Sequence, residues 1–121
     1  MAAPVWRTIN AITLATVNMS ASTNFYQRLG LFVTYGGPAA DFTTLSSEPA
    51  SNTSAMHVNL YSSSDYSPPP AGSWNKWGRC IFYVSDVDAM YRLALKEGFK
   101  PEMPPSDAPW GERGSAHRIS A

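Results

Sequence analysis

The sequence predicts an α+β fold built from two copies of one unit, in which a strand is followed by a helix and three further strands. Shifting the sequence by 68 residues aligns positions 9–19 with 77–87 without a gap. Both copies then continue in the same order, with a capping residue, a helix and a glycine. A length of 121 residues fits one domain. We therefore expect a single domain over 1–121, with a first module at about 8–61, a linker at 62–76 and a second module at about 77–121.

The first module contains one predicted helix between predicted strands. Residues 8–16 are rich in Ile, Thr and Leu, which is typical of a strand. A short helix is predicted over 20–29, because Asn18 or Ser20 can accept hydrogen bonds from its first turn and Gly30 can end it in the left-handed conformation. Three more strands are predicted at Phe32–Tyr35, 41–45 and 56–61.

The second module repeats this order incompletely. A strand is predicted at 79–84 and a helix at about 86–97, capped by Ser85 or Asp86. Weaker strands are predicted near 99–103 and 111–119. The 68-residue shift places the last strand at 124–129, beyond residue 121. We therefore expect the second module to lack its last strand, and we expect a homodimer to cover the open sheet edge.

Side chains alternate between the two faces of a strand, and this predicts a binding surface. In the fourth strand Val58 and Leu60 share an apolar face, which should carry the helices. The opposite face is polar and aromatic, which suits a ligand-binding cleft, although a solvent-exposed sheet surface is the alternative. Its predicted members are Thr13, His57, Asn59, Tyr61, Arg79 and Tyr83.

These residues differ in what they could bind. The planar guanidinium of Arg79 suits a carboxylate or phosphate, unless it pairs with Glu112 or lies on the surface. Tyr61 and Tyr83 could stack on a planar ligand, or pack in the core or at the rim of the cleft. His57 could be a general base, a ligand or a surface residue, and Asn59 could hold a ligand by hydrogen bonds or have a structural role. The single cysteine, Cys80, falls on the helix-facing side and is expected in the core.

Charge and composition exclude several classes of protein. Nine basic and nine acidic residues give a net charge of zero, which argues against nucleic acid or an anionic membrane as the main partner. No apolar run approaches the roughly 18 residues of a membrane span. The N-terminus lacks the pattern of a signal peptide, so a soluble cytoplasmic protein is expected.

Several stretches resemble the glyoxalase / bleomycin resistance protein / extradiol dioxygenase superfamily, also called vicinal oxygen chelate (VOC) proteins. They are Phe25-Tyr26-Gln27-Arg28-Leu29-Gly30, Val84-Ser85-Asp86-Val87-Asp88-Ala89 and Gly111-Glu112-Arg113. The resemblance implies paired βαβββ modules that form a curved mixed sheet around a cleft. Metal-using members place ligands on the first strand, usually His or Gln, and on the last strand, usually Glu, of each module.

The ligand positions implied by the resemblance are largely lost in this sequence. The two first-strand positions hold Ala11 and Arg79, and the last-strand position of the first module holds or adjoins Asn59. An alanine has no ligating atom, and a permanent cation repels a metal. We expect no cofactor; a divalent metal would need ligands from His57, Glu112 or a partner chain.

The leading hypothesis is a metal-independent, glyoxalase/bleomycin-resistance-like protein that binds an organic or anionic small molecule as a homodimer. The ligand-binding residues would be Thr13, His57, Asn59, Tyr61, Arg79, Tyr83 and Glu112. One alternative is an enzyme of the same superfamily, a metal-dependent lyase, isomerase or dioxygenase. Another is a fold without a ligand that serves association alone. Whether the chain is an enzyme stays open at this point.

Overall fold

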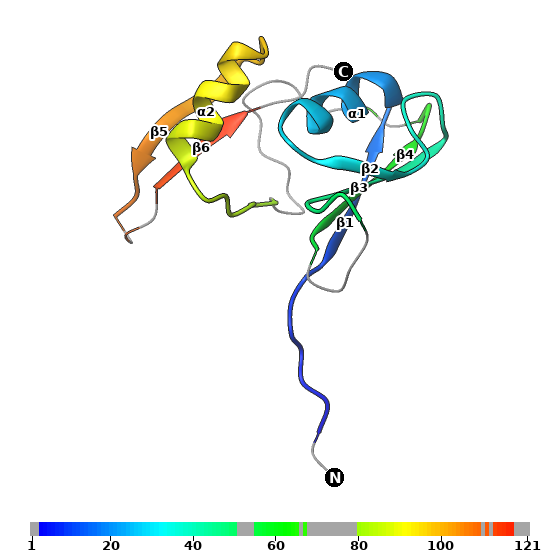
Figure 1. The fold of residues 1–121 in the computed structure, drawn as a ribbon, viewed down its shortest axis with the longest axis horizontal. Helices are drawn as coiled ribbons and strands as arrows, with labels where there is room; N and C mark the ends of the chain where they lie inside the picture. The colour runs from blue at the N-terminus through cyan, green and yellow to red at the C-terminus, as the bar shows by residue number, and fades with distance from the viewer. Residues whose placement is uncertain are drawn as a thin grey trace. The chain divides into compact units, whose positions relative to one another are not determined.

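The computed structural model describes residues 3–50, 55–65, 67, 80–109, 111 and 113–117, apart from the side chains of 101, 102, 116 and 117. The chain divides into unit 1, Met1–Asp65, and unit 2, Tyr66–Ala121. Within the described residues, no helix is long and apolar enough to cross a membrane. The elements, in chain order, are β1 (Ala11–Thr16), α1 (Met19–Arg28), β2 (Phe32–Tyr35), β3 (Phe42–Ser46), β4 (His57–Ser62), α2 (Val87–Lys96), β5 (Pro101–Asp107) and β6 (Arg113–His117) (Figure 1).

Unit 1 is a curved four-stranded mixed sheet with α1 on one face. The strand order is β1-β4-β3-β2. The first strand runs parallel to β4, whereas β3 is antiparallel to both of its neighbours. The α+β fold class and the order of strand, helix and three strands in the first module are therefore confirmed, with bounds that differ from the predicted ones by a few residues.

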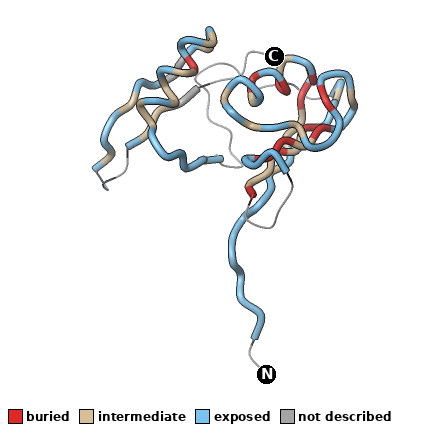
Figure 2. The backbone as a smooth tube through the Cα atoms, in the orientation of Figure 1, coloured by how far each residue is buried: buried red, intermediate tan, exposed pale blue. Residues whose placement is uncertain are grey.

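The core of unit 1 lies between α1 and the sheet. Met19, Leu45, Val58 and Leu60 form a buried cluster, and Figure 2 shows that the buried residues of unit 1 lie on α1 and on the strands of the sheet. Leu45 of β3 and Val58 and Leu60 of β4 point toward α1, so this face of the sheet is buried, whereas most side chains of the opposite face are partly or fully exposed. The partly buried residues packed around the cluster are Ile12, Leu14, Tyr26, Leu31, Val33 and Met56.

The two helices begin and end in the same way, as the sequence repeat predicts. The Oδ1 atom of Asn18 accepts from Ala21 N at 3.0 Å, and Oδ1 of Asp86 accepts from Ala89 N at 3.0 Å. After the helices, Gly30 and Gly98 adopt φ values of +104° and +87°. Each helix has 10 residues, and the 68-residue shift superimposes their bounds.

Unit 2 consists of α2 and a two-stranded antiparallel sheet of β5 and β6. The weak strands predicted near 99–103 and 111–119 are present, with shifted bounds. Strand β5 contains Pro101, Pro104 and Pro105, which have no N–H group to donate. The pairing with β6 shifts register around Met103 and Ser106, and a strand with one neighbour tolerates such prolines.

One arginine joins the elements of unit 2. Arg113 Nε donates to Asp88 Oδ2 and its Nη2 to Asp88 Oδ1, each at 2.8 Å, while Nη1 donates to Asp107 Oδ1 at 3.1 Å. The start of β6 is thereby tied to the first turn of α2 and to the end of β5. Asp88 and Arg113 belong to two of the stretches that carry the family resemblance, so these stretches have a structural role here.

The Asp88–Arg113 pair predicts a loss of stability in acid. Hydrogen bonding to Arg113 lowers the pKa of Asp88, so this carboxylate stabilises the folded state above the pKa it has when unfolded, about 4. That contribution is lost as the pH falls through the lower, folded pKa. We expect Asp88→Asn to lower the melting temperature at pH 7, and we expect the difference from the native chain to shrink below about pH 4. Melting curves at several pH values, with Asp65→Asn as control, check this; a pH-independent difference would contradict it.

The strand predicted at 79–84 is not formed in its described part, 80–84. A strand needs a hydrogen-bonded neighbour, which β1 has in β4. All of this stretch is exposed, Phe82 and Val84 to 39% and 38% and Ile81 to 76%.

Cys80 is exposed, so the prediction that it lies in the core is wrong. It lies at the start of the stretch 80–84, which does not form a strand and is exposed throughout. Strand β1 also begins at Ala11 rather than at residue 8, because its pairing with β4 begins where Ala11 meets His57. Residues 3–10 extend away from the sheet (Figure 1).

Candidate functional site

The face of the unit 1 sheet opposite α1, here called the open face, carries the candidate site. The pairing of β1, β4 and β3 places its side chains in three rows that cross the strands. These are the first row (Ala11, His57, Ser46), the middle row (Thr13, Asn59, Thr44) and the third row (Ala15, Tyr61, Phe42).

The middle row is a line of hydrogen bonds that crosses three strands. Thr44 Oγ1 donates to Asn59 Oδ1 at 2.8 Å, and Asn59 Nδ2 donates to Thr13 Oγ1 at 3.4 Å. The carboxamide of Asn59 thus bridges the hydroxyls of Thr44 and Thr13. Asn59 and Thr44 are partly buried and Thr13 is exposed, so the line is accessible from the Thr13 end.

The third row is aromatic. Tyr61 and Phe42 lie directly opposite each other on neighbouring strands, and they remain 43% and 40% exposed. The ring of Phe42 also meets that of Tyr35 edge to face, with 6.5 Å between the centroids. Exposed aromatic side chains that are held by cross-strand neighbours provide a pre-formed surface for a flat ligand.

The first row contains a histidine that is held from one side. His57 Nδ1 lies 3.3 Å from the carbonyl oxygen of Asn10. Because a carbonyl oxygen only accepts, Nδ1 carries the hydrogen in this contact and Nε2 is the other ring nitrogen available for bonding. Ser46 is fully buried, and its Oγ accepts from the backbone N of Glu48 at 3.1 Å. The side chain of Ser46 therefore stabilises the loop after β3 by a hydrogen bond.

The structure brings together four of the predicted site residues: Thr13, His57, Asn59 and Tyr61 share the open face. Tyr83 lies in unit 2, in the stretch 80–84, and is 84% exposed. Arg79 and Glu112 lie outside the described residues.

Sequence reasoning missed Thr44 and Phe42 as members of the site. Both lie at alternate positions of β3, and the register with β4 puts them beside Asn59 and Tyr61. The alternation of side chains in β3 was available in the sequence, but only the pairing shows which of its two faces adjoins Asn59.

The donors of the open face do not fit the four-ligand metal site that the fold family implies. Ala11 pairs with His57, so a methyl group stands on β1 beside the imidazole. The other polar groups of the three rows are one carboxamide, the hydroxyls of Thr and Ser, and a phenol. A tightly bound divalent ion needs several strong N, O or S donors that converge. Among the described residues, no group of three or more His, Cys, Asp or Glu side chains could hold a metal.

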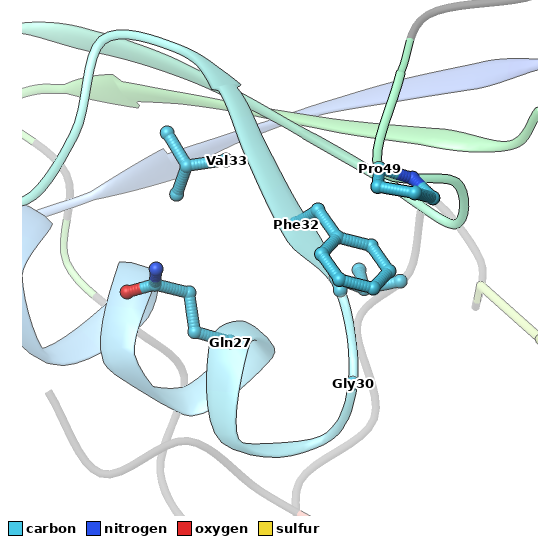
Figure 3. Close-up of a pocket in the computed structure, with 6 residues that line it drawn as sticks. Gln27, Gly30, Phe32, Val33 and Pro49 are labelled. Atoms are coloured by element: carbon cyan, nitrogen blue, oxygen red, sulfur yellow. The ribbon is translucent and has the colours of Figure 1, made fainter.

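A hollow of about 490 Å³ lies at the end of α1, where the chain enters β2 (Figure 3). None of its lining residues belongs to the three rows, and Gln27 supplies the polar side chain of the lining. The hollow contains no titratable group and is less suited to specific recognition than the open face. Its lining residues are Gln27, Gly30, Leu31, Phe32, Val33 and Pro49.

Comparison with known proteins gives a consistent result. The family model described as Glyoxalase/Bleomycin resistance protein/Dioxygenase superfamily matches residues 8–119. No curated protein matches the sequence. Among solved structures, TioX from Micromonospora sp. ML1 is 20% identical, with 93% of this chain and 89% of that chain covered and a TM-score of 0.67.

Two further solved structures have the same fold. A bleomycin resistance determinant encoded on the transposon Tn5 is 18% identical, with 88% of this chain and 84% of that chain covered and a TM-score of 0.64. A glyoxalase/bleomycin resistance protein/dioxygenase from Nocardioides is 22% identical, with 97% of this chain and 79% of that chain covered and a TM-score of 0.61. At these identities the likeness concerns the fold.

Proposed function

The chain belongs to the Glyoxalase/Bleomycin resistance protein/Dioxygenase superfamily, and we propose that it is a small-molecule-binding protein that works without a metal. The open face of unit 1 is the binding surface. The observation that carries this proposal is the middle row, in which Thr44, Asn59 and Thr13 are linked by hydrogen bonds and accessible at one end.

The chemistry of the open face supports binding more than catalysis. It combines oriented hydrogen-bonding groups with two exposed aromatic rings, the combination by which small-molecule sites fix the orientation of a ligand. His57 is the titratable imidazole of the three rows, and no carboxylate accompanies it there. General acid–base catalysis usually needs a second group that orients or complements the base.

The proposal includes a homodimer in the cytoplasm whose ligand is an organic or anionic small molecule. A second copy would cover the exposed apolar side chains of the stretch 80–84, where Ile81 is 76% exposed. Arg79 and Glu112 would join the ligand-binding residues, Arg79 as the partner of an anionic group. Sedimentation of the chain as a monomer at micromolar concentration would contradict the dimer.

Removing metal from the purified chain tests the proposal. We expect a chain treated with EDTA to keep the melting temperature and the ligand response of the untreated chain, because no metal contributes to either. A thermal-shift screen that includes bleomycin supplies the ligands, since binding to the folded state raises the melting temperature. Stoichiometric bound metal that is lost in His57→Ala would overturn the proposal and favour a metal-dependent enzyme.

A further inference from the structure

We propose that residues 3–10, here called the arm, bind a second copy of this chain, where they add a strand to the outer edge of β2 and place Trp6 in the hollow at the end of α1. This inference rests on the homodimer of the proposed function and names a segment that joins the two copies. Three features of unit 1 carry it: the exposure of the arm, the lining of the hollow, and the position of both at one end of the sheet.

The arm carries apolar side chains that unit 1 leaves in solvent. Trp6 is fully exposed, and Val5 and Ile9 are largely exposed. The arm continues the line of β1 away from the sheet (Figure 1). Burying a tryptophan side chain removes about 150–250 Å² of surface from water. A fully exposed indole on an extended segment therefore favours contact with another apolar surface.

The hollow at the end of α1 suits an indole ring. Its volume of about 490 Å³ lies in the range of pockets that hold whole drug-sized ligands, so it has room for one aromatic side chain. Phe32 and Val33 of β2 line it, and its side chains are apolar apart from that of Gln27 (Figure 3). The carboxamide oxygen of Gln27 can accept a hydrogen bond from the indole N–H.

Strand β2, which forms part of this lining, is also an edge of the sheet. Within the part of the chain that the structure describes, its one strand neighbour is β3. An edge strand presents unpaired N–H and C=O groups along its outer side, and an extended segment can pair with them as an added strand. The arm would thus gain backbone hydrogen bonds along β2 and burial of Trp6 in the hollow beside it.

The arm of the same chain cannot make this contact. A strand added to β2 would lie four strand spacings from β1, about 19 Å. The five residues from Ala11 to Trp6 span at most about 18 Å when fully extended. A segment stretched across the end of the sheet also cannot run along β2. The arm that pairs with β2 therefore comes from a second copy.

The sheet topology allows two copies to exchange their arms. Strands β1 and β2 run in the same direction, because β1 is parallel to β4 while β3 is antiparallel to β4 and β2. Phe32 pairs with Ser46 and so extends the first row, which contains Ala11. The arm therefore leaves the sheet at the end where β2 begins.

Two sheets that meet at this end, about a two-fold axis perpendicular to them, align the β1 edge of each with the β2 edge of the other. Each arm then runs antiparallel to the partner's β2. Both arms and both β2 edges are used, so the assembly closes as a dimer and leaves no free arm for a third copy.

Sedimentation and NMR of the full chain test the inference. Trp6→Ala should raise the dissociation constant of the dimer at least about thirtyfold, the effect of losing a buried aromatic anchor. Arg7→Ala is the matched control: its side chain points to the opposite side of the extended arm, and the constant should change by less than about threefold. In a mixture of ¹³C-labelled and unlabelled chains, NOEs should join the labelled methyl groups of Leu31 and Val33 to the unlabelled indole of Trp6, and Trp6→Ala should remove them.

The remaining outcomes separate this inference from the proposed function. If the chain dimerises and Trp6→Ala leaves the dissociation constant unchanged, the arm does not join the copies, while the dimer of the proposed function stands. If the NOEs between Trp6 and the hollow arise only within one chain, the hollow holds its own arm and the inference is overturned. If the native chain sediments as a monomer at micromolar concentration, the arm contact and the proposed dimer both fail.

Discussion

Replacing Gly36 with alanine is expected to disrupt the β2–β3 hairpin and to cost more than about 2 kcal/mol of unfolding free energy. Gly36 has a φ of +74°, which side-chain-bearing residues rarely adopt. A Cβ atom there would also collide with the backbone carbonyl oxygen of Phe42. The neighbouring Gly37 makes two hydrogen bonds with the side chain of Thr43. Oγ1 of Thr43 accepts from Gly37 N at 3.1 Å and donates to Gly37 O at 2.8 Å. The backbone therefore has little freedom to move away from the collision.

Gly30→Ala is the matched control for this prediction. Gly30 also has a positive φ, +104°, but a Cβ atom there would meet nothing within 4 Å. It should therefore show the cost of the backbone conformation alone, about 1–2 kcal/mol. Urea denaturation of both variants, followed by circular dichroism, measures the difference. Equal losses of unfolding free energy in Gly36→Ala and Gly30→Ala would mean that the predicted collision with β3 does not occur.

Two neighbouring residues of β4 are expected to separate stability from binding. Leu60 is 1% exposed and belongs to the core cluster, so Leu60→Ala should cost about 2–5 kcal/mol through lost burial and the cavity that remains. Tyr61 points to the open face and is 43% exposed. Tyr61→Ala should cost less than about 1 kcal/mol of stability but should weaken the binding of any ligand found in the thermal-shift screen.

Denaturation curves and ligand titrations on both variants, Leu60→Ala and Tyr61→Ala, check these two predictions. Leu60→Ala, studied at a temperature where it is still folded, should retain the ligand affinity of the native chain. The assignment of the two faces would be wrong if Tyr61→Ala proved the more destabilising change, or if it left every ligand affinity unaltered.

The two helices and the strands of unit 1 could be predicted from the sequence because their signals are local. The helix caps Asn18 and Asp86 and the glycines that follow both helices gave the helix positions within one or two residues. The alternation of Val58 and Leu60 with His57, Asn59 and Tyr61 gave the correct faces of β4. These features depend on a few neighbouring residues, and the alternation of side chains holds where a strand has a pairing partner.

The sequence-based predictions that were wrong or missing concern contacts between segments that are distant in the sequence. Residues 80–84 have the composition of a strand, yet strand formation depends on a neighbour that composition does not reveal. Cys80 was therefore placed in the core, although it is exposed. Thr44 and Phe42 were missed because only the register of β3 with β4 places them beside Asn59 and Tyr61. Likewise, the ion pair between Asp88 and Arg113 joins residues 25 apart.

The most direct test of the central claim, that the open face of unit 1 binds small molecules without a metal, is to map the binding surface by NMR in the presence of EDTA. The compound with the largest thermal shift would be titrated into the ¹⁵N-labelled chain. We predict chemical-shift changes that cluster on Thr13, Thr44, Asn59 and Tyr61 and persist in EDTA. Changes confined to α1 or to unit 2, or a loss of binding when EDTA is added, would contradict the claim.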